Sequence, residues 1–424
     1  MFFPRLETDL PRGRLAVKLK NKALAPLRNG DFRIYEDSVE KLSAKGSAGD
    51  VAVLFDRKQK FAGAGLFDPF SPVRVKVLSN SSSLPAVGSE LFSLLIRGAL
   101  DPRKAGFAAC GEATNAFRLV NGESDGFPGL VADRYDKALV LKLYSAAWLP
   151  HAGTVAECFF HALPELEYLV IRLSRELSHL PEKDLCGLTD GKLFSAKGEE
   201  ALRKWDGKTL FRENGLLFEA DLVRGQKTGF FLDQRENRAE AGRLAGGKSV
   251  LNVFSYSGGF SLYAAKGGAK SVTDVDISKY AIKESERNFR RNTDFPGVAA
   301  CCHTGIAGDA FEVMQRLLAE KKSFDMVIVD PPSFAKSAAE SENALRSYAR
   351  LARLGSALVR KGGILVFASC SSRVGKEELF PAVNGAVAES GRRGEVFLVT
   401  EHAFDHPAKF PESKYLKCQY ARIF

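Results

Sequence analysis

From residue 249 onward, short apolar runs alternate with segments of helical periodicity, and this alternation constrains the fold more than any other feature of the chain. Strands are expected at 249–254, 271–276, 326–329 and 364–368, and helices at 260–266, 279–292, 311–322 and 343–359. That order is typical of a parallel α/β sheet. In such a sheet, ligands bind outside the carboxyl ends of the strands. The residues directly after each strand are therefore the candidates for function.

Two further regions precede this one. Residues 14–79 contain short apolar or alternating runs separated by glycine and Asp-Pro turns, which indicates a small β-rich domain. A polar linker at 80–83 then leads into a mixture of predicted helices (91–100, 152–162) and strands (138–143, 169–173). We therefore expect three domains: a β-rich one over 1–80, a central α+β one over 81–220, and the mostly parallel α/β domain over 221–424.

The charge of the chain favours an anionic partner. Lysine and arginine outnumber aspartate and glutamate by 61 to 51 over 424 residues, a net charge of +10. Residues 1–80 carry fifteen of these cations against nine carboxylates, more than half of the excess. Basic side chains bind nucleic acids because they release counterions from phosphates. The first domain is therefore either a small solubilising β-barrel or a module that docks onto RNA.

Cysteine usage and hydropathy exclude several classes of protein. The seven cysteines have no regular spacing and form no Cys-x-x-Cys motif, which argues against a disulfide framework and against structural zinc. Pro4, Glu7 and Asp9 interrupt the start of the chain, and no apolar run approaches the length of a membrane span. We therefore expect a cytoplasmic protein without a membrane partner.

The segment after the first strand of the α/β domain suits a nucleoside cofactor. Ser257-Gly258-Gly259 lets the main chain approach a ligand closely, because glycine has no Cβ and tolerates positive φ. Asp276 ends the second strand, where it can accept bonds from both ribose hydroxyls, and Asp309 follows the third, where it can meet an adenine amino group. The dinucleotide fingerprint Gly-x-Gly-x-x-Gly is absent. The pattern therefore favours S-adenosyl-L-methionine over NAD or FAD.

A second contribution to this cofactor site is expected from segment 225–235, ahead of the first strand. Its Lys227, Thr228 and Gln234 are candidates for holding the methionine carboxylate, while the same segment also fits a helix N-terminus that packs on the sheet. The expected cofactor-binding residues are Lys227, Thr228, Gln234, Phe254, Ser257, Gly258, Gly259, Asp276, Ile277, Asp309, Ala310 and Asp330.

Two residues at the ends of later strands indicate the chemistry. Asp330 opens an Asp-Pro-Pro-Ser sequence after strand 326–329, and Cys370 follows strand 364–368. Carbon-5 of cytosine becomes a useful nucleophile only after a thiolate adds to carbon-6, which is a form of covalent catalysis. The reaction needs a reactive cysteine, an acid beside the ring nitrogen and a methyl sulfonium, and it needs no metal. Cys370 and Asp330 fit the first two needs, so the sequence predicts formation of 5-methylcytosine on a base flipped out of its stack.

Other interpretations of these residues stay open. A cysteine at a strand end is commonly a small buried hydrophobe, and a carboxylate before two prolines can cap a turn. Asp-Pro-Pro also serves enzymes that methylate base nitrogens on guanine or adenine, which need no thiol. In those enzymes an aromatic residue directly follows the second proline, whereas here Ser333 intervenes before Phe334. An RNA-binding assembly factor without catalysis is the third alternative.

Several longer motifs resemble one protein family. They lie at 115–130 (NAFRLVNGESDGFPGL), 225–235, 254–260, 330–334, 405–407 (Asp-His-Pro) and 415–417 (Tyr-Leu-Lys). Over nearly the whole chain the sequence is similar to the bacterial large-subunit (23S) ribosomal RNA cytosine-C5 methyltransferases, which join an N-terminal PUA domain to a class I S-adenosylmethionine-dependent methyltransferase domain. The resemblance implies that Cys370 is the nucleophile and that Asp276 and Asp309 bind the cofactor nucleoside. It also implies that Asp330 and its prolines, Pro331 and Pro332, hold the flipped base, and we expect Ser333 and Phe334 to contribute to substrate binding.

The resemblance further implies a PUA fold for the first domain and ribosomal RNA as the partner, and we expect a monomer or a homodimer. Two departures stand out. Residues 28–32 read Arg-Asn-Gly-Asp-Phe where many relatives carry His-Pro-Trp. Ser333 stands where two-cysteine RNA methyltransferases have a second thiol, so the base that removes the C5 proton stays unassigned between Asp330 and water. For His406 we expect a structural hydrogen bond.

Overall fold

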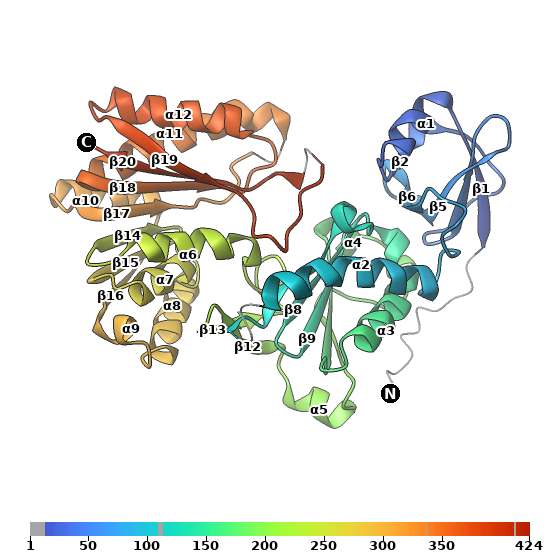
Figure 1. The fold of residues 1–424 in the computed structure, drawn as a ribbon, viewed down its shortest axis with the longest axis horizontal. Coiled ribbons are helices and arrows are strands. Elements are labelled where there is room, and N and C mark those ends of the chain that lie inside the picture. The colour runs from blue at the N-terminus through green and yellow to red at the C-terminus, as the bar shows by residue number, and fades with distance from the viewer. Residues whose placement is uncertain (1–12, 109–112, 336, 411–412) are drawn as a thin grey trace. The chain divides into compact units, whose positions relative to one another are not determined.

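The computed structural model describes residues 13–108, 113–335, 337–410 and 413–424, and these pack into two compact units (Figure 1). The first unit comprises the described residues up to Gly215 with Glu219–Leu232 and Phe404–Pro407; the second comprises Leu216–Phe218, Asp233–Ala403 and the described part of Ala408–Phe424. Residues 221–232, expected in the α/β domain, thus pack with the first unit. Within the ranges described, no helix is long and apolar enough to cross a membrane.

A six-stranded sheet in the order β2-β6-β5-β4-β1-β3 forms the N-terminal part of the first unit. Its strands alternate between exposed and buried residues because one face covers a core: in β1, Leu15, Val17 and Leu19 point inward. The β-rich prediction for this region is confirmed. Its elements are β1 (Arg14–Leu19), α1 (Asn21–Arg28), β2 (Arg33–Tyr35), β3 (Val39–Leu42), β4 (Val51–Phe55), β5 (Phe61–Phe67) and β6 (Val73–Ser79).

The rest of the first unit is built on a five-stranded sheet in the order β11-β10-β9-β8-β7. α2 and α3 contact each other and bury Phe92 and Phe159 in the same core as Trp148. The predicted strand 138–143 and helix 152–162 have the expected bounds. The elements are α2 (Ser89–Phe107), β7 (Ala116–Asn121), β8 (Leu130–Tyr135), β9 (Ala138–Leu143), α3 (Ala152–Ala162), β10 (Tyr168–Leu173), α4 (Arg175–Ser178), β11 (Lys192–Ser195), α5 (Glu199–Lys204) and the paired strands β12 (Lys208–Glu213) and β13 (Leu216–Asp221).

A seven-stranded sheet in the order β16-β15-β14-β17-β18-β20-β19 forms the second unit. Its first five strands run parallel, and β20 runs antiparallel between β18 and β19. Helices cover both faces, with α6–α8 on one and α10–α12 on the other (Figure 1). The mostly parallel α/β prediction is therefore confirmed. The elements are α6 (Arg235–Leu244), β14 (Ser249–Val253), α7 (Gly259–Lys266), β15 (Ser271–Asp276), α8 (Lys279–Arg291), α9 (Pro296–Ala300), β16 (Cys302–Ala307), α10 (Ala310–Ala319), β17 (Phe324–Val329), α11 (Ser341–Leu358), β18 (Val359–Ser369), α12 (Lys376–Glu389), β19 (Gly394–Thr400) and β20 (Lys417–Ile423).

Candidate active site

Four parallel strands of the second unit end side by side. Val253 of β14 pairs with Val275 of β15 on one side and with Val329 of β17 on the other, and Val329 pairs with Phe367 of β18. The segments that follow these four residues therefore leave the sheet at one edge, where α/β proteins bind their ligands. Most of the residues predicted to carry function lie in these segments.

The loop after β14 has an unusual backbone. Phe254, Tyr256 and Gly258 have positive φ angles of 64°, 48° and 77°, a conformation that costs non-glycine residues roughly 1–3 kcal/mol and concentrates at functional sites. A Cβ at Gly258 would lie 2.0 Å from the Ser285 hydroxyl of α8. The sequence predicts a close approach between this glycine and a ligand, but the close approach that requires glycine here is to the protein's own helix.

Two buried hydroxyl groups in the same loop are unsatisfied. Among the described residues, neither Ser255 Oγ nor Ser257 Oγ has a hydrogen-bond partner, although the two residues are only 5% and 3% exposed. Leaving a buried polar group unpaired costs about 1–3 kcal/mol. Unpaired buried groups fit a loop that completes its hydrogen bonds with a bound ligand, and Gly259 begins α7 directly after them.

Asp276 is the last residue of β15, Ile277 follows it, and both border this loop. The carboxylate of Asp276 accepts hydrogen bonds from the main-chain N–H groups of Tyr256 and Ser278, both at 2.9 Å. Each oxygen thus has one bond, and the carboxylate is fixed at the sheet edge. Ile277 beside it is 76% exposed. A fixed carboxylate next to an exposed apolar side chain fits a ribose and a flat base.

Asp309 has a structural role in addition to its predicted contact with the adenine. Its Oδ1 accepts hydrogen bonds from the N–H groups of Phe311 at 2.9 Å and Glu312 at 3.2 Å, so Asp309 is the N-cap of α10. Ala310 is the first residue of that helix and is 5% exposed. The cap fixes the Asp309 carboxylate after β16, where the sequence places an adenine contact.

A buried polar cluster supports the loop after β14. Asp274 of β15 is fully buried and accepts hydrogen bonds from Ser261 and, at 2.5 Å, from Ser285. His303 Nε2 lies 2.8 Å from the same carboxylate. Ser285 is the residue against which Gly258 packs. Asp274 therefore holds in place the helix surface on which the loop rests, a function that its position inside an apolar strand does not reveal.

On the other half of the edge, Asp330 follows β17 and is held by distant residues. Its Oδ2 accepts a hydrogen bond of 2.9 Å from Gln234 Nε2. Gln234 is 3% exposed, and its oxygen accepts a bond of 2.6 Å from Asn237. Both sides of the Gln234 amide are thus bonded within the protein. These bonds show that Gln234 supports the Asp330 carboxylate, and the predicted contact of Gln234 with the methionine carboxylate stays a prediction.

The segment after Asp330 turns partly inward. Pro331 is buried, Pro332 and Ser333 are exposed, and the Ser333 hydroxyl donates to the main-chain carbonyl two residues on. The Phe334 ring packs 5.1 Å from the ring of Tyr348 in α11. Pro332 and Ser333 are therefore the exposed residues at the start of this segment, and Phe334 is half-buried against the core.

Cys370 directly follows β18 and is half-buried. A second cysteine, Cys418 of β20, lies opposite Ala368 and is fully buried. Burial, with a smaller effect of the Asp330 charge, raises the pKa of Cys418 to about 12. A thiol with that pKa stays protonated at neutral pH and is a weak nucleophile. Of these two thiols, Cys370 is therefore the one available for chemistry.

Sequence comparisons bear on this geometry. A family model of S-adenosylmethionine-dependent methyltransferases matches residues 194–413, and a PUA-like domain matches residues 17–80. A ribosomal RNA large subunit methyltransferase from Deinococcus radiodurans is 44% identical over 414 residues, which cover 97% of this chain and 98% of the relative. Ribosomal RNA large subunit methyltransferase I from Shewanella amazonensis is 32% identical over 420 residues, which cover 97% of this chain and 100% of the relative. The chain belongs to the ribosomal RNA large subunit methyltransferase family.

Two solved structures share the fold at 22% identity. A methyltransferase in complex with SAH matches with a TM-score of 0.77 over 97% of this chain and 100% of its own. A SAM-dependent methyltransferase from Streptococcus mutans matches with a TM-score of 0.76 over 96% of this chain and 99% of its own. The predicted class I methyltransferase fold and N-terminal PUA-like domain are confirmed. The cofactor of this methyltransferase is S-adenosyl-L-methionine.

Lys227 and Thr228 of the methyltransferase lie in the first unit. Thr228 is 1% exposed; its hydroxyl donates to Asp133 at 2.6 Å and lies 3.1 Å from the Tyr135 hydroxyl. The Lys227 ammonium lies 4.7 Å from the ring centre of Phe231. The Thr228 side chain is thus engaged in holding its own loop, and a cofactor contact from Lys227 stays a prediction.

The structural role predicted for His406 is confirmed. His406 is 2% exposed, and its Nδ1 lies 3.1 Å from Asp405 Oδ1. The other oxygen of Asp405 accepts a bond of 2.8 Å from the Arg118 main chain, and the Asp405 carbonyl accepts one of 2.8 Å from Arg103. The segment Phe404–Pro407 is thereby fastened to the first unit.

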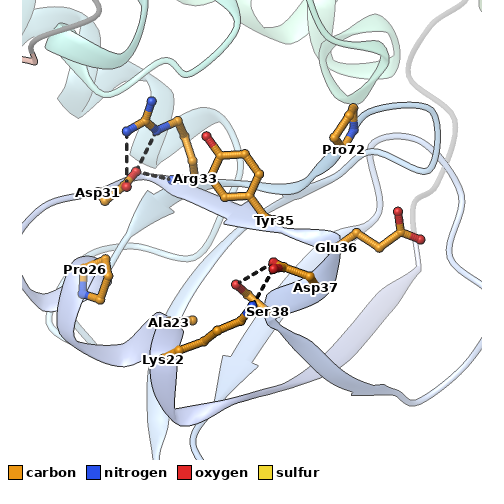
Figure 2. Close-up of a pocket in the computed structure, with 10 residues that line it drawn as sticks. All are labelled: Lys22, Ala23, Pro26, Asp31, Arg33, Tyr35, Glu36, Asp37, Ser38 and Pro72. Carbon is orange, nitrogen blue, oxygen red and sulfur yellow. Dashed lines mark hydrogen bonds and ion pairs between the residues drawn. The ribbon is translucent and has the colours of Figure 1, made fainter.

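A separate hollow of about 470 Å³ lies in the N-terminal sheet domain of the methyltransferase (Figure 2). Both of its cations are paired: Arg33 bonds Asp31 at 2.9 Å, and Lys22 bonds Asp37. With Glu36, the lining holds three carboxylates against two cations. A lining with this balance does not attract phosphate, so the positive excess of the domain lies elsewhere on its surface.

Proposed function

We propose that this enzyme methylates RNA of the large ribosomal subunit and forms 5-methylcytosine through a covalent bond from Cys370 to carbon-6 of the base. Ribosomal RNA is supported by the names of the relatives, which cover nearly the whole chain. The PUA-like domain and the positive excess of residues 1–80 support docking of that RNA by the first domain.

In this proposal the cofactor is bound by the half of the edge formed after β14, β15 and β16. Asp276 holds the ribose, Ile277 packs on the adenine, and Asp309 bonds its amino group. The unpaired hydroxyls of Ser255 and Ser257 supply further donors. When bound there, S-adenosyl-L-methionine supplies an electrophilic methyl group.

The chain's own residues perform the remaining chemistry. The Cys370 thiolate forms a bond to carbon-6 of cytosine, and the electrons of the C5–C6 double bond become available at carbon-5. Acting as the acid, Asp330 passes a proton to ring nitrogen N3, which takes up the electron pair displaced by the addition and favours this electron flow. Carbon-5 then takes the methyl group from the sulfonium, which leaves as a neutral thioether. The C5 proton leaves to a base, the sulfur–carbon bond breaks, N3 returns its proton to Asp330, and the Cys370 thiolate is restored.

One observation carries the proposal: Asp330 and the half-buried Cys370 directly follow the neighbouring strands β17 and β18, while nearby Cys418 is fully buried and stays protonated. A methyltransferase acting on a base nitrogen needs no cysteine there. Pro332 and Ser333, both exposed after Asp330, are the contacts we propose for the flipped base.

The test uses large-subunit ribosomal RNA transcribed with 5-fluorocytidine, since fluorine cannot leave carbon-5 as a proton does and the covalent bond persists. We expect a protein–RNA adduct with the wild type and with the control Cys418→Ala, and none with Cys370→Ala. Denaturing gels after nuclease digestion detect the adduct, and peptide mass spectrometry locates it.

An adduct that persists in Cys370→Ala would contradict the proposal. Full activity of Cys370→Ala, with a methylated purine in nucleoside mass spectrometry, would instead establish nitrogen methylation.

A further inference from the structure

Lys417, at the start of β20, is a buried cation beside Cys370. It pairs with Ser369 in the antiparallel register and is 2% exposed. Its ammonium donates to the main-chain carbonyls of Ser371 and Val374, and to that of Tyr415 at 3.2 Å. The first two carbonyls belong to the turn that Cys370 opens, so the turn wraps around the ammonium.

The bonds of Lys417 identify it as the charged form. An ammonium has three N–H donors, and three carbonyls receive them; a neutral amine has only two. Burial lowers the pKa of Lys417 to about 8, and the negative charges of Cys370, Glu378 and Glu377, in that order, act in the opposite direction. With that pKa about nine tenths of the side chain is protonated at pH 7.

The titratable groups around Lys417 come from three parts of the second unit. Cys370 lies in the turn after β18, Glu377 and Glu378 lie exposed in the first turn of α12, and Tyr348 comes from α11. Burial raises the pKa of Tyr348, and the Cys370 charge adds to this, so the phenol stays neutral. Tyr348 also accepts a bond of 3.1 Å from Ser369. Lys417 is thus the cation of this cluster, and the carboxylates face solvent.

We propose that Lys417 is a positioning residue that supplies the counter-charge for the Cys370 thiolate and fixes the turn carrying it. The inference rests on the proposed role of Cys370 as nucleophile. A nearby ammonium favours the thiolate over the thiol, which raises the reactive fraction at neutral pH. Lys417 does not exchange a proton with the substrate in this proposal, because its three N–H donors already bond main-chain carbonyls.

The test measures the rate of iodoacetamide alkylation at Cys370 as a function of pH, residue by residue, by peptide mass spectrometry of the full chain. Exposed Cys302 serves as the reference in every sample. In the wild type we expect the Cys370 profile to have its midpoint below that of Cys302. Lys417→Met should move the Cys370 midpoint up by about one pH unit, a loss of about tenfold in rate at pH 7, and leave Cys302 unchanged. Lys417→Arg, which keeps the charge, should restore most of the rate.

A wild-type midpoint at or above that of Cys302 would overturn the inference without any variant, so a variant that fails to fold does not remove the test. An unchanged Cys370 profile in folded Lys417→Met would overturn it as well. The proposed function fails independently of this inference. A Cys370 profile shifted by Lys417→Met, without a 5-fluorocytidine adduct, would support the charge pairing and reject the cytosine chemistry. An adduct together with an unchanged Cys370 profile would support the cytosine chemistry and reject the charge pairing.

Discussion

The two halves of the sheet edge are built in different ways. On the half that we propose for the cofactor, main-chain N–H groups fix both carboxylates: Tyr256 and Ser278 donate to Asp276, and Phe311 and Glu312 donate to Asp309. On the reacting half, Asp330 is held by Gln234, 96 residues away. The turn after Cys370 is held by Lys417, 46 residues from Ser371. Main-chain donors thus fix the carboxylates of the first half, and side chains from distant segments hold Asp330 and the turn after Cys370 in the second.

Each half of the edge should therefore be sensitive to a different kind of substitution. A site fixed by its own main chain depends on backbone conformation, and a change of backbone propensity should weaken cofactor binding. A site fixed by distant side chains depends on individual hydrogen bonds, so single side-chain changes should reduce turnover and leave cofactor affinity nearly unchanged.

The largest effect is expected at Asp330. Asp330→Asn should lower kcat by about 10²–10⁴-fold, because the variant amide cannot act as an acid beside the ring nitrogen. Gln234→Ala should lower it less, since it removes only the bond that orients Asp330. Single-turnover methyl transfer to ribosomal RNA measures both, and calorimetry gives the dissociation constant of the cofactor. If Asp330→Asn instead weakened cofactor binding and left turnover intact, Asp330 would belong to the cofactor half.

The next effect is expected at Gly258. Gly258→Ala places a Cβ 2.0 Å from the Ser285 hydroxyl at a φ of 77°, which should lower the free energy of unfolding by roughly 1–3 kcal/mol. A displaced loop should also weaken cofactor binding by about tenfold, equivalent to 1.4 kcal/mol. Gly247→Ala is the matched control, because Gly247 has a φ of 71° and nothing within 4 Å of its Cβ position. Equal losses in the two variants would show that contact with α8 is unimportant.

The smallest effect is expected at Ile277. Because this side chain is 76% exposed, Ile277→Ala should change the free energy of unfolding by less than about 0.5 kcal/mol. Loss of apolar contact with the adenine should raise the cofactor dissociation constant by about three- to tenfold. Val399→Ala on edge strand β19, where Val399 is 46% exposed, is the control that should leave binding unchanged. Equal dissociation constants for Ile277→Ala and the wild type would remove Ile277 from the adenine site.

The same distinction explains what could be predicted from the sequence. The alternation of strands and helices is a local property, and β15 and the first strands and helices of the second unit lie within a residue or two of their predicted bounds. The strand predicted at 364–368 begins earlier in the structure, at Val359, as β18. The sequence does not predict this earlier part because residues 360–363 are polar or glycine and give no apolar signal. The candidate carboxylates are predictable because each lies at a strand end: Asp276 is the last residue of β15, Asp309 comes two residues after β16, and Asp330 directly follows β17.

The remaining contacts depend on tertiary structure. Gln234 stands in a motif that suits a cofactor, and only the folded chain shows its amide bonded to Asp330 and Asn237. Asp274 looks like one more polar residue beside Asp276 until its cluster with Ser285 and His303 is seen. Lys417 lies in a motif with no evident chemistry, and its meaning comes from the pairing of β20 with β18.

That pairing also imposes an order on assembly. β20 follows β19 in the chain yet lies between β19 and β18, so β19 joins the sheet only through β20. A folding intermediate without β20 would offer unpaired strand edges, which favour aggregation. It would also lack Lys417, which reaches the turn after β18 only as part of β20. Under the proposed counter-charge role of Lys417, completion of the sheet and activation of Cys370 would therefore be a single step.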